Sequence, residues 1–467
     1  MTDALGNSDA LGVAERIRKG EITAQEALDA AIARVERTNP ELNFMVTEGY
    51  DYARKRLAGP PLKGPFAGVP TLIKDLLPMA GLPTKFGCRA LANFQLPDQS
   101  PYMDALLAAG LVPIGKSSTP EFGLTATTEP LLGGPTKNPW DTSKSSGGSS
   151  GGAAVAVAAR AVPIAHASDG GGSIRIPASC NGLFGLKVSR NRTVATNGLE
   201  VGIALSVNGC ESISVRDTAA WLDVTEQKGA NAALTPVGNV TGPSTKRLRI
   251  GLCIQDTLGR DPDADVVTAI EDAATLCRDL GHSVRIVSLP AEGATFASSF
   301  TLAWAAIASE VAKMVRAAAP GVPDEHVLEP LSLALAALRD NAPPNAFEEA
   351  VATLNEIDVR YAAMFNEIDV LLTPVLASTP PKLGEISPTS GMDGFAKVER
   401  YVGYTPFQNA AGAPAISVPL AWSAESGMPI GAHFSAAKGH ERTLLELGYE
   451  LEQARPWANR KPKVNAG

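Results

Sequence analysis

Two amphipathic helices open the chain. Residues 9–19 carry apolar side chains at helical spacing and precede Gly20, a residue that commonly ends a helix. A second helix begins at Thr23, where the sequence Thr-Ala-Gln-Glu forms a capping box, and its pattern continues to about Thr38, just before Pro40. Both patterns leave one side polar, so we expect these helices to pack on the outside of the fold.

The spacing of apolar residues then changes, and short apolar runs predict buried strands. Residues 64–77 and 111–116 are two such runs, and a helix capped by Ser100 separates them. Residues 153–161 are alanine and valine with one arginine, which suits a short helix packed against a sheet better than a membrane span. The apolar residues after Pro163 predict the next strand.

Strand and helix patterns alternate again in the second half of the chain. Residues 247–254 predict a strand, 264–280 a helix and 282–289 another strand. A mostly helical segment covers 291–366, and 368–374 returns to a strand pattern. Alternation of this kind is typical of α/β folds.

The C-terminal part predicts a loop and then a return to the core. Residues 380–397 are rich in proline, glycine and serine and predict a loop bordering a substrate entrance, whereas 416–452 predict two strands and a helix. The chemical motifs between residues 74 and 419 belong to one site, so we expect 1–467 to form a single domain. Its parts are N-terminal helices, a catalytic core, a more variable helical part, and returning core strands with a helix, at 1–60, 61–220, 250–400 and 401–455.

Composition narrows the function classes. The chain has 467 residues with a net charge of −8, and no cluster of lysine and arginine forms a basic stripe, so nucleic-acid binding is not expected. Residues 1–10 lack the apolar core of a signal peptide, so we expect a cytoplasmic protein that does not associate with membranes. The cysteines are odd in number and lack metal-ligand spacing, so we expect reduced core residues and no metal site; they are Cys88, Cys180, Cys210, Cys253 and Cys277.

The stretch at 145–173 carries the candidate chemistry. Two glycine-rich turns, each with serines, flank the short helix, and in the second turn three glycines directly precede Ser173. Glycine allows a close approach to the backbone, and consecutive N–H groups beside a hydroxyl are typical of a nucleophile with its own oxyanion hole. A flexible linker is the simpler interpretation of Gly-Ser repeats, but a linker is not followed by a packed apolar helix.

A nucleophile elbow is a second interpretation. Residues 147–151 match Gly-x-Ser-x-Gly, which would make Ser149 the nucleophile of an α/β-hydrolase-like esterase. That mechanism requires a histidine and an acid downstream, and the elbow expects a preceding strand, whereas 138–144 read as irregular. The histidines available are His282, His326, His433 and His440.

Taken together, these motifs resemble the amidase signature family of serine hydrolases. The resemblance rests on Gly-Gly-Ser-Ser-Gly-Gly at 147–152, Asp-Gly-Gly-Gly-Ser-Ile-Arg at 169–175 and a strand ending Ile-Lys-Asp at 73–75. Further matches lie at 134–141 and 409–419, and the likeness covers essentially the whole chain. It implies a large mixed, twisted β-sheet with helices on both faces.

The resemblance also implies roles for individual residues. Lys74 would be the base, Ser149 the bridging serine on a cis peptide and Ser173 the nucleophile, with backbone N–H groups of Gly170, Gly171, Gly172 and Ser173 as the oxyanion hole. Asp169 and Arg175 would form a structural ion pair that holds the turn. A neutral lysine can act as a base near neutral pH because burial lowers its pKa. No metal and no cofactor is implied.

Two departures from the family pattern bear on the substrate. Position 170 is glycine where threonine or isoleucine is usual, which widens the acyl side. Val402 holds the position of an aspartate that anchors glutamine in tRNA amidotransferase subunits, and residues 301–330 lack that group's arginine motif. We therefore expect a free-standing amidase acting on a small carboxamide or anilide. A subunit of a tRNA transamidation complex is the alternative, and self-association as a homodimer stays open.

Overall fold

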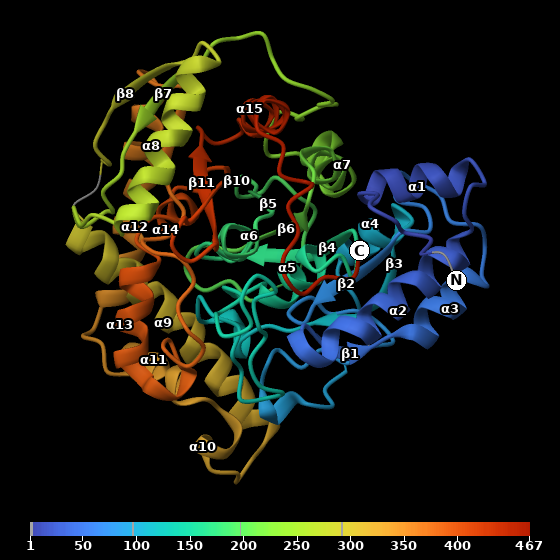
Figure 1. The fold of residues 1–467 in the computed structure, drawn as a ribbon. Helices are drawn as coiled ribbons and strands as arrows, with labels where there is room; N and C mark the ends of the chain where they lie inside the picture. The colour runs from blue at the N-terminus through green and yellow to red at the C-terminus, as the bar shows by residue number, and fades with distance from the viewer. Residues whose placement is uncertain (1–2, 96–97, 197, 291–292) are drawn as a thin grey trace.

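The structure is a computed structural model that describes residues 3–95, 98–196, 198–290 and 293–467. A single sheet of 11 strands forms its centre (Figure 1). The strands are β1 (Met45–Glu48), β2 (Pro70–Lys74), β3 (Val112–Ser117), β4 (Ile164–Asp169), β5 (Phe184–Lys187), β6 (Val207–Ser212), β7 (Arg249–Leu252), β8 (Ser283–Ile286), β9 (Val370–Pro374), β10 (Ala415–Trp422) and β11 (Pro429–Ser435).

The sheet is mixed. Its strand order is β1-β3-β2-β4-β6-β5-β10-β11-β9-β7-β8. The pairs of β2 with β3 and with β4 are parallel, as are those of β7 with β8 and with β9, and the remaining pairs are antiparallel. Strands β10 and β11, which come from the C-terminal part of the chain, thus lie between β5 and β9. The expectation of a mixed α/β sheet is confirmed.

Helices cover both faces of this sheet (Figure 1). They are α1 (Ala10–Arg18), α2 (Ala24–Leu42), α3 (Tyr50–Leu57), α4 (Pro101–Ala108), α5 (Gly151–Ala158), α6 (Arg175–Asn181), α7 (Val215–Thr225), α8 (Ala264–Asp279), α9 (Gly293–Ala318), α10 (Asp324–Val327), α11 (Pro330–Asp340), α12 (Ala346–Met364), α13 (Gly391–Tyr401), α14 (Pro406–Ala410) and α15 (Glu441–Ala454). Strand β4 illustrates the two faces. The His166 ring packs against Tyr102 of α4 and Trp221 of α7, whereas Asp169, three residues on, pairs with Arg175 of α6.

The N-terminal helices form with one difference from the prediction. The capping box is present, because Thr23 Oγ1 accepts from the Glu26 N–H at 3.1 Å while the Glu26 carboxylate accepts from the Thr23 N–H at 2.7 Å. Helix α2 nevertheless continues through Pro40 and ends only at Asn43, which has left-handed backbone geometry. A proline in the last turn removes only one backbone hydrogen bond of the helix, because few helical residues follow it. The Asn39 side-chain oxygen accepts from the N–H groups of Phe44 and Met45, just beyond the helix end.

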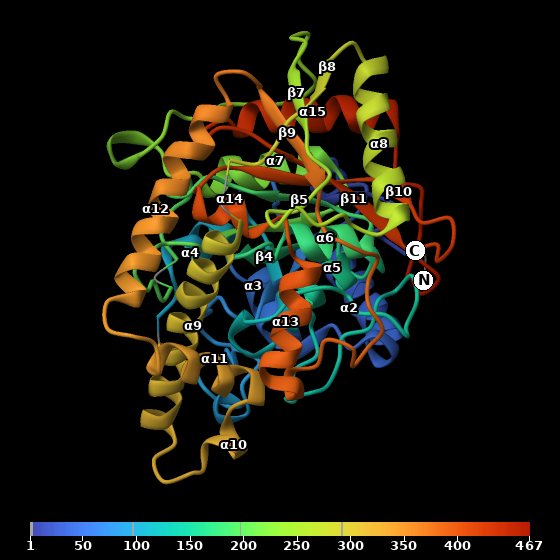
Figure 2. The same ribbon diagram turned by 90° about the vertical axis from the view of Figure 1, so that its left-hand side faces the viewer.

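The mostly helical part predicted for 291–366 is present as α9, α10, α11 and α12, which lie together with α13 in Figure 2; residues 291 and 292 lie outside the described residues.

The loop predicted for 380–397 is correct only as far as 387. A short 3-10 turn, η4 (Pro388–Ser390), and then α13 occupy the rest. Phe395 and Val398 give α13 an apolar side that is buried against the neighbouring helices, so packing favours a helix there.

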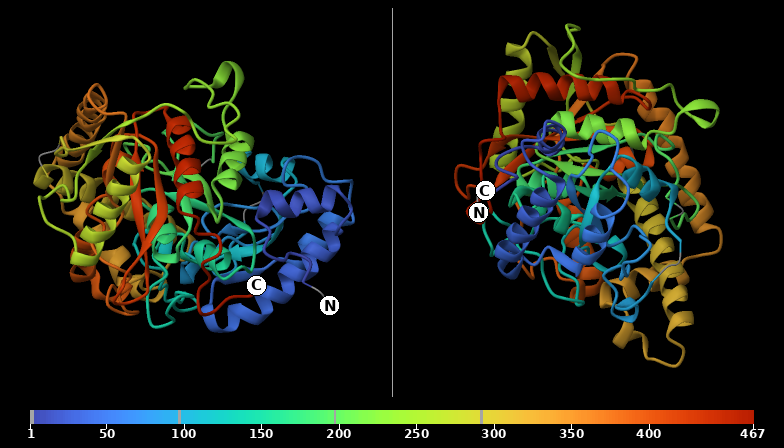
Figure 3. Two further views of the ribbon diagram at one scale, coloured as in Figure 1. Left: turned by 45° about the horizontal axis from the view of Figure 1, so that its top comes forward. Right: turned by 90° about the vertical axis from the view of Figure 1, so that its right-hand side faces the viewer.

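The two chain ends approach one another (Figure 3). The Lys461 ammonium donates to the Asn7 side chain at 2.9 Å, and Arg37 of α2 donates to the carbonyl of Ala466. Within the described ranges, no helix has both the length and the apolar character needed to cross a bilayer.

The topology brings the candidate motifs together. Strands β2 and β4 are parallel neighbours, paired through Leu72 and Ala165, so their C-terminal ends meet at the same edge of the sheet. Lys74 is the last residue of β2, and β4 ends at Asp169, where the second glycine turn begins. Helix α5 starts at Gly151, within the first glycine motif, and places that turn at the same edge.

Candidate active site

The two glycine turns meet at the edge where β2 and β4 end. The Gly148–Ser149 peptide bond is cis, as the resemblance implies. A Cβ atom at Gly148 would lie 2.7 Å from the carbonyl oxygen of Thr127, so only glycine fits at this close approach. The Ser150 N–H donates to the Ser173 carbonyl at 3.3 Å and thereby joins the first turn to the second.

Lys74 lies among serine hydroxyls. Its Nζ is 2.8 Å from Ser149 Oγ and 2.8 Å from Ser150 Oγ, and it also contacts Ser168 at 3.0 Å (Oγ) and 3.4 Å (carbonyl). Ser150 Oγ donates in turn to the Ser168 carbonyl at 3.1 Å. Ser149 makes no such second contact among the described residues, so its hydroxyl is the less constrained of the two.

The charge state of Lys74 suits a base. Complete burial lowers its pKa to about 7, although the carboxyl groups of Asp169 and Glu211 oppose that shift. Ionised side chains lose hydration when buried, so the neutral amine is favoured. A substantial fraction of Lys74 is therefore neutral near pH 7, where an exposed lysine would be almost fully charged.

Ser173 borders a cavity of about 340 Å³. The residue is buried, with 7% of its surface exposed, and it forms part of the lining of that cavity. Gly123 lines the same cavity, and a Cβ at Gly123 would lie 3.0 Å from Ser149 Oγ, so the bridging serine also lies close to the cavity wall. The candidate base, bridging serine and nucleophile thus converge beside one cavity.

The backbone donors beside Ser173 differ from the prediction at one position. The Gly172 N–H donates to Asp169 Oδ1 at 2.7 Å, so this group is engaged within the turn. The N–H groups of Gly170, Gly171 and Ser173 remain as candidate oxyanion donors. Gly172 is instead required by its backbone, because its φ is +129° and the Thr405 hydroxyl occupies the space that a Cβ would take.

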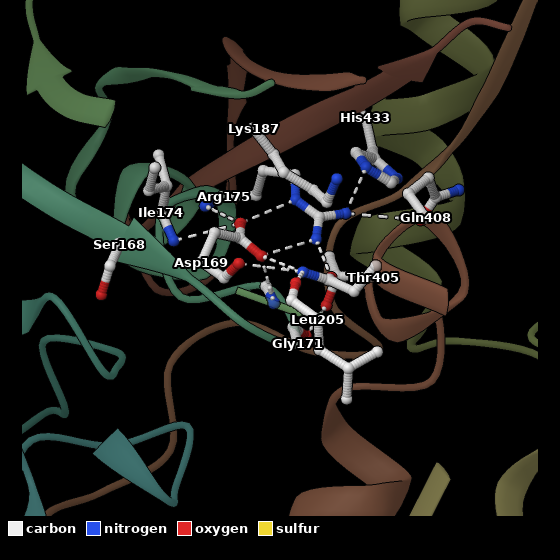
Figure 4. A network of polar contacts seen from close by, with 12 residues as sticks. Ser168, Asp169, Gly171, Ile174, Arg175, Lys187, Leu205, Thr405, Gln408 and His433 are labelled. Atoms are coloured by element: carbon white, nitrogen blue, oxygen red, sulfur yellow. Dashed lines mark hydrogen bonds and ion pairs between the residues drawn. The ribbon is translucent and has the colours of Figure 1, made fainter. Parts of the chain in front are cut away.

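A buried ion pair holds this turn (Figure 4). Arg175 Nη2 lies 2.9 Å from Asp169 Oδ1 and Arg175 Nε 2.9 Å from Asp169 Oδ2, with both side chains fully buried. Burial alone would raise the pKa of Asp169, but Arg175 and Lys187 hold the pKa of this carboxyl well below its usual value. The expected pairing of Asp169 with Arg175 is therefore present, and it contacts the N–H groups of Gly172 and Ile174 directly.

Two of the histidines available to the elbow interpretation make contacts away from Ser149. His433 contacts Arg175 Nη1 at 3.1 Å and Thr373 Oγ1 at 2.9 Å, which makes it a buried support of the ion pair. His282 pairs with Glu450 at 2.9 Å on the far half of the sheet. The side-chain partner of the Ser149 hydroxyl is Lys74, and the residues before Ser149 form turns and two isolated bridges.

The two departures noted in the sequence have structural counterparts. The ring of Trp304 fills the space beside Gly170, where a Cβ would lie 3.2 Å from ring carbons Cη2 and Cζ3. Val402 is buried and lines the cavity, so an apolar side chain stands where the resemblance places an aspartate in amidotransferase subunits. The five cysteines are free and buried, as expected.

Several residues of the site carried no signal in the sequence. Ser168 contacts Lys74 only because β4 and β2 are neighbours in the sheet. Thr405 donates its hydroxyl to the Gly171 carbonyl at 2.7 Å from a segment more than 200 residues away. Ser150 is different, because it lies beside Ser149 in the same glycine-serine motif. The motif did not indicate that Ser150 would contact Lys74.

Comparison with known proteins agrees with this geometry. The sequence pattern of the family described as Amidase matches residues 26–445. The chain is 41% identical to a putative amidase AmiC of Mycobacterium leprae, over 98% of this chain and 97% of that protein. It is 33% identical to the 6-aminohexanoate-cyclic-dimer hydrolase of Paenarthrobacter ureafaciens, over 98% and 96%.

The fold agrees as well. A solved structure of a 6-aminohexanoate cyclic dimer hydrolase with its substrate superposes with a TM-score of 0.89 at 30% identity, covering 98% of this chain and 99% of that one. Family pattern, relatives and fold coincide over nearly the whole length. The chain therefore belongs to the amidase family, as a member of the amidase signature enzymes, and is a hydrolase that acts on amides.

Proposed function

We propose that this protein hydrolyses an uncharged carboxamide or anilide through an acyl-enzyme, with Ser173 as nucleophile, Ser149 as proton relay and Lys74 as base. The observation that carries the proposal is the contact of Lys74 Nζ with Ser149 Oγ at 2.8 Å, fully buried beside the cavity onto which Ser173 opens. A serine hydroxyl is a weak nucleophile until an adjacent base takes its proton.

In the first half of the reaction, Ser173 Oγ attacks the amide carbonyl carbon. The proton of Ser173 passes to Ser149, and the proton of Ser149 passes to neutral Lys74. The carbonyl oxygen becomes an oxyanion, which the N–H groups of Gly170, Gly171 and Ser173 stabilise; one such donor contributes about 3–4 kcal/mol in known cases. The relay then returns the proton to the amide nitrogen, the C–N bond breaks and the amine leaves.

In the second half, water attacks the ester carbon of the acyl-enzyme. The relay takes a proton from that water and delivers it to Ser173 Oγ as the acid is released, so the enzyme returns to its starting state. Among the described residues, the Ser149 hydroxyl contacts Lys74 but forms no hydrogen bond with Ser173 Oγ. We expect substrate binding to complete that contact, since catalytic hydrogen bonds often tighten only in the substrate complex.

The cavity supports a free-standing amidase over an amidotransferase subunit. The charged side chains lining it are Arg260, which is paired with Asp256 at 2.6 Å, and Glu399, whose carboxylate accepts from the Thr301 hydroxyl at 2.6 Å. Glutamine is a zwitterion, and among the described lining residues its carboxylate would find no cation without a counter-charge. An uncharged amide fits a cavity whose remaining lining is largely apolar.

Labelling tests the assignment of the nucleophile. We expect a fluorophosphonate probe to modify Ser173 of the purified chain, detected by peptide mass spectrometry, and Ser173→Ala to abolish both labelling and amide hydrolysis. Modification of Ser149 instead would contradict the assignment and favour the elbow mechanism. The chain alone should hydrolyse simple amides, with the 6-aminohexanoate cyclic dimer as one substrate to include; a requirement for a partner protein would favour the amidotransferase alternative.

A further inference from the structure

Helix α9 presents two stacked rings to the active-site cavity. The rings of Phe300 and Trp304 lie with centroids 5.8 Å apart at an interplanar angle of 17°, and we call this pair the aromatic wall. Trp304 Nε1 donates to the Leu124 carbonyl at 3.0 Å, which fixes the ring against another residue of the cavity lining. The wall is therefore a preformed flat surface, held at one end by a hydrogen bond.

The aromatic wall lies directly beside the oxyanion donors. A Cβ at Gly170 would be 3.2 Å from the Trp304 ring, and a Cβ at Gly171 would be 3.4 Å from Cζ of Phe300. Contacts of 3.2 Å are too close for a side chain unless the ring moves. The absence of a side chain at Gly170 thus lets the Trp304 ring approach the backbone that binds the carbonyl oxygen.

The rest of the cavity lining is largely apolar. Leu124, Ile176, Phe296 and Val402 line it along with the wall, and the other lining residues include Arg260, which is paired with Asp256, and Glu399, which accepts from Thr301. A volume of about 340 Å³ is at the small end of ligand sites, which commonly measure about 300–1,000 Å³. A compact, uncharged group fits this space.

The proton relay distinguishes the two sides of the substrate. The leaving nitrogen must receive its proton from Ser149, which lies beside Gly123. The acyl substituent points away from that nitrogen across the carbonyl carbon, and the aromatic wall covers Gly170 and Gly171. The contact of the wall with Gly170 and Gly171 is the basis for assigning it to the acyl side of the scissile bond.

We infer that the aromatic wall binds the acyl group of the substrate and selects a flat, apolar, uncharged acyl group such as benzoyl. This inference rests on the proposed function, because it assumes an acyl-enzyme on Ser173. It differs from selection of an anilide, in which the aromatic ring belongs to the leaving amine. Offset stacking on aromatic rings adds to the burial of apolar area, so a flat acyl group benefits from both effects.

Breakdown of the acyl-enzyme tests the inference, because only the acyl group is still bound at that stage. The p-nitrophenyl esters of benzoic and acetic acid would be used to form the two acyl-enzymes, and their hydrolysis followed by stopped flow and intact mass. We expect Trp304→Ala to slow acylation by the benzoyl ester and hydrolysis of the benzoyl-enzyme by about tenfold or more, while both acetyl rates stay within about twofold. Trp304→Phe, which keeps a flat ring, should retain most of the benzoyl rates.

Controls make the outcomes distinct. Met314 lies on the same helix, is 60% exposed and does not line the cavity, so Met314→Ala should leave all rates unchanged. If Trp304→Ala slows acylation by anilides but leaves benzoyl-enzyme hydrolysis unchanged, the wall binds the leaving amine and the inference is wrong. Equal effects on benzoyl and acetyl groups would also overturn it, and if Trp304→Ala does not fold, Trp304→Phe and Phe300→Leu provide the same comparison. An unmodified Ser173 in the wild type would instead contradict the proposed function.

Discussion

Lys74 Nζ lies 2.8 Å from Ser149 Oγ at the edge where β2 and β4 end, and both side chains are buried. Ser150 is equally close to Lys74, but its hydroxyl donates to the Ser168 carbonyl. Ser150 is thus held to β4 by its hydrogen bond to Ser168, whereas the Ser149 hydroxyl has only Lys74 as a side-chain partner among the described residues. This difference leads to the first two predictions.

The first prediction concerns pH. Lys74 acts as a base only when neutral, and burial lowers its pKa to about 7. We expect kcat/KM for a neutral amide to rise from about pH 6 to 8 and then level off, because kcat/KM reports the ionisation of the free enzyme. Lys74→Ala should remove this rise and lower the rate by about a hundredfold or more. The measurement is the pH profile of kcat/KM for both proteins.

Lys74→Arg is the matched variant for that test. An arginine keeps the positive charge but cannot lose its proton at accessible pH, so it should not restore activity. Amides should also be affected more than esters, because an amine leaving group needs the returned proton. Wild-type amide turnover in Lys74→Ala at neutral pH would show that another group is the base.

The second prediction separates the two adjacent serines. Ser149→Ala removes the hydroxyl that we propose relays a proton between Ser173 and Lys74, so kcat should fall by about 10²–10⁴-fold. Ser150→Ala removes a hydrogen-bonding partner of Lys74 but leaves the relay intact, and we expect a loss of about tenfold or less. Steady-state kinetics on one amide, with circular dichroism to verify folding, makes the comparison; larger damage from Ser150→Ala would reverse the roles.

The third prediction concerns stability. Asp169→Asn leaves the fully buried Arg175 without its counter-charge, and breaking such a pair typically costs about 3–5 kcal/mol. We expect the denaturant midpoint to fall accordingly. Because Asp169 also favours the charged form of Lys74, any active Asp169→Asn protein should show the rise in kcat/KM at lower pH than the wild type.

The control for that measurement is an exposed ion pair. Arg285 and Glu367 lie 2.6 Å apart with side chains that are 53% and 73% exposed. Water screens such a pair, so Glu367→Gln should leave the denaturant midpoint nearly unchanged. Similar losses in both variants would indicate that the Asp169–Arg175 pair contributes no more than a surface contact.

The fourth prediction concerns a buried acid far along the chain from the motifs. Burial raises the pKa of Glu329 to about 8, and the neighbouring Glu121 adds to the shift. The folded state then binds more protons than the unfolded state between about pH 4.5 and 8, so this residue favours folding at acidic pH and that contribution is lost as pH rises through about 8. Glu329→Gln should stabilise the protein at pH 8 by on the order of 1 kcal/mol, with no gain at pH 5.

Urea unfolding at pH 5, 6.5 and 8 measures this difference. Glutamine can still accept the Leu131 N–H, which bonds to Glu329 Oε1 at 2.6 Å, so the variant removes the ionisation rather than the contact. The exposed Glu425 supplies the control, since Glu425→Gln should not change the slope of stability with pH. A Glu329→Gln protein that is no more stable than the wild type at pH 8 would contradict the prediction.

Local sequence determined the candidate reacting groups of this protein. Glycines at fixed spacing around Ser149 and Ser173, and a lysine at the end of an apolar run, are features of adjacent residues, and each reflects a local demand for close backbone approach or for a buried strand. The same kind of local pattern predicted the alternating strands and helices and the capping box at Thr23. Those features survive in the structure because they depend on neighbours in the chain.

Tertiary structure alone decided how those groups are arranged. The positions of β10 and β11 in the middle of the sheet, the contact of Ser168 with Lys74 and the approach of Trp304 to Gly170 all join segments that are distant in the sequence or in different elements. The engagement of the Gly172 N–H by Asp169 likewise depends on the turn's exact geometry, because a run of glycines does not specify which N–H points to which acceptor. Such contacts follow from packing of the whole chain, and no local pattern of residues encodes them.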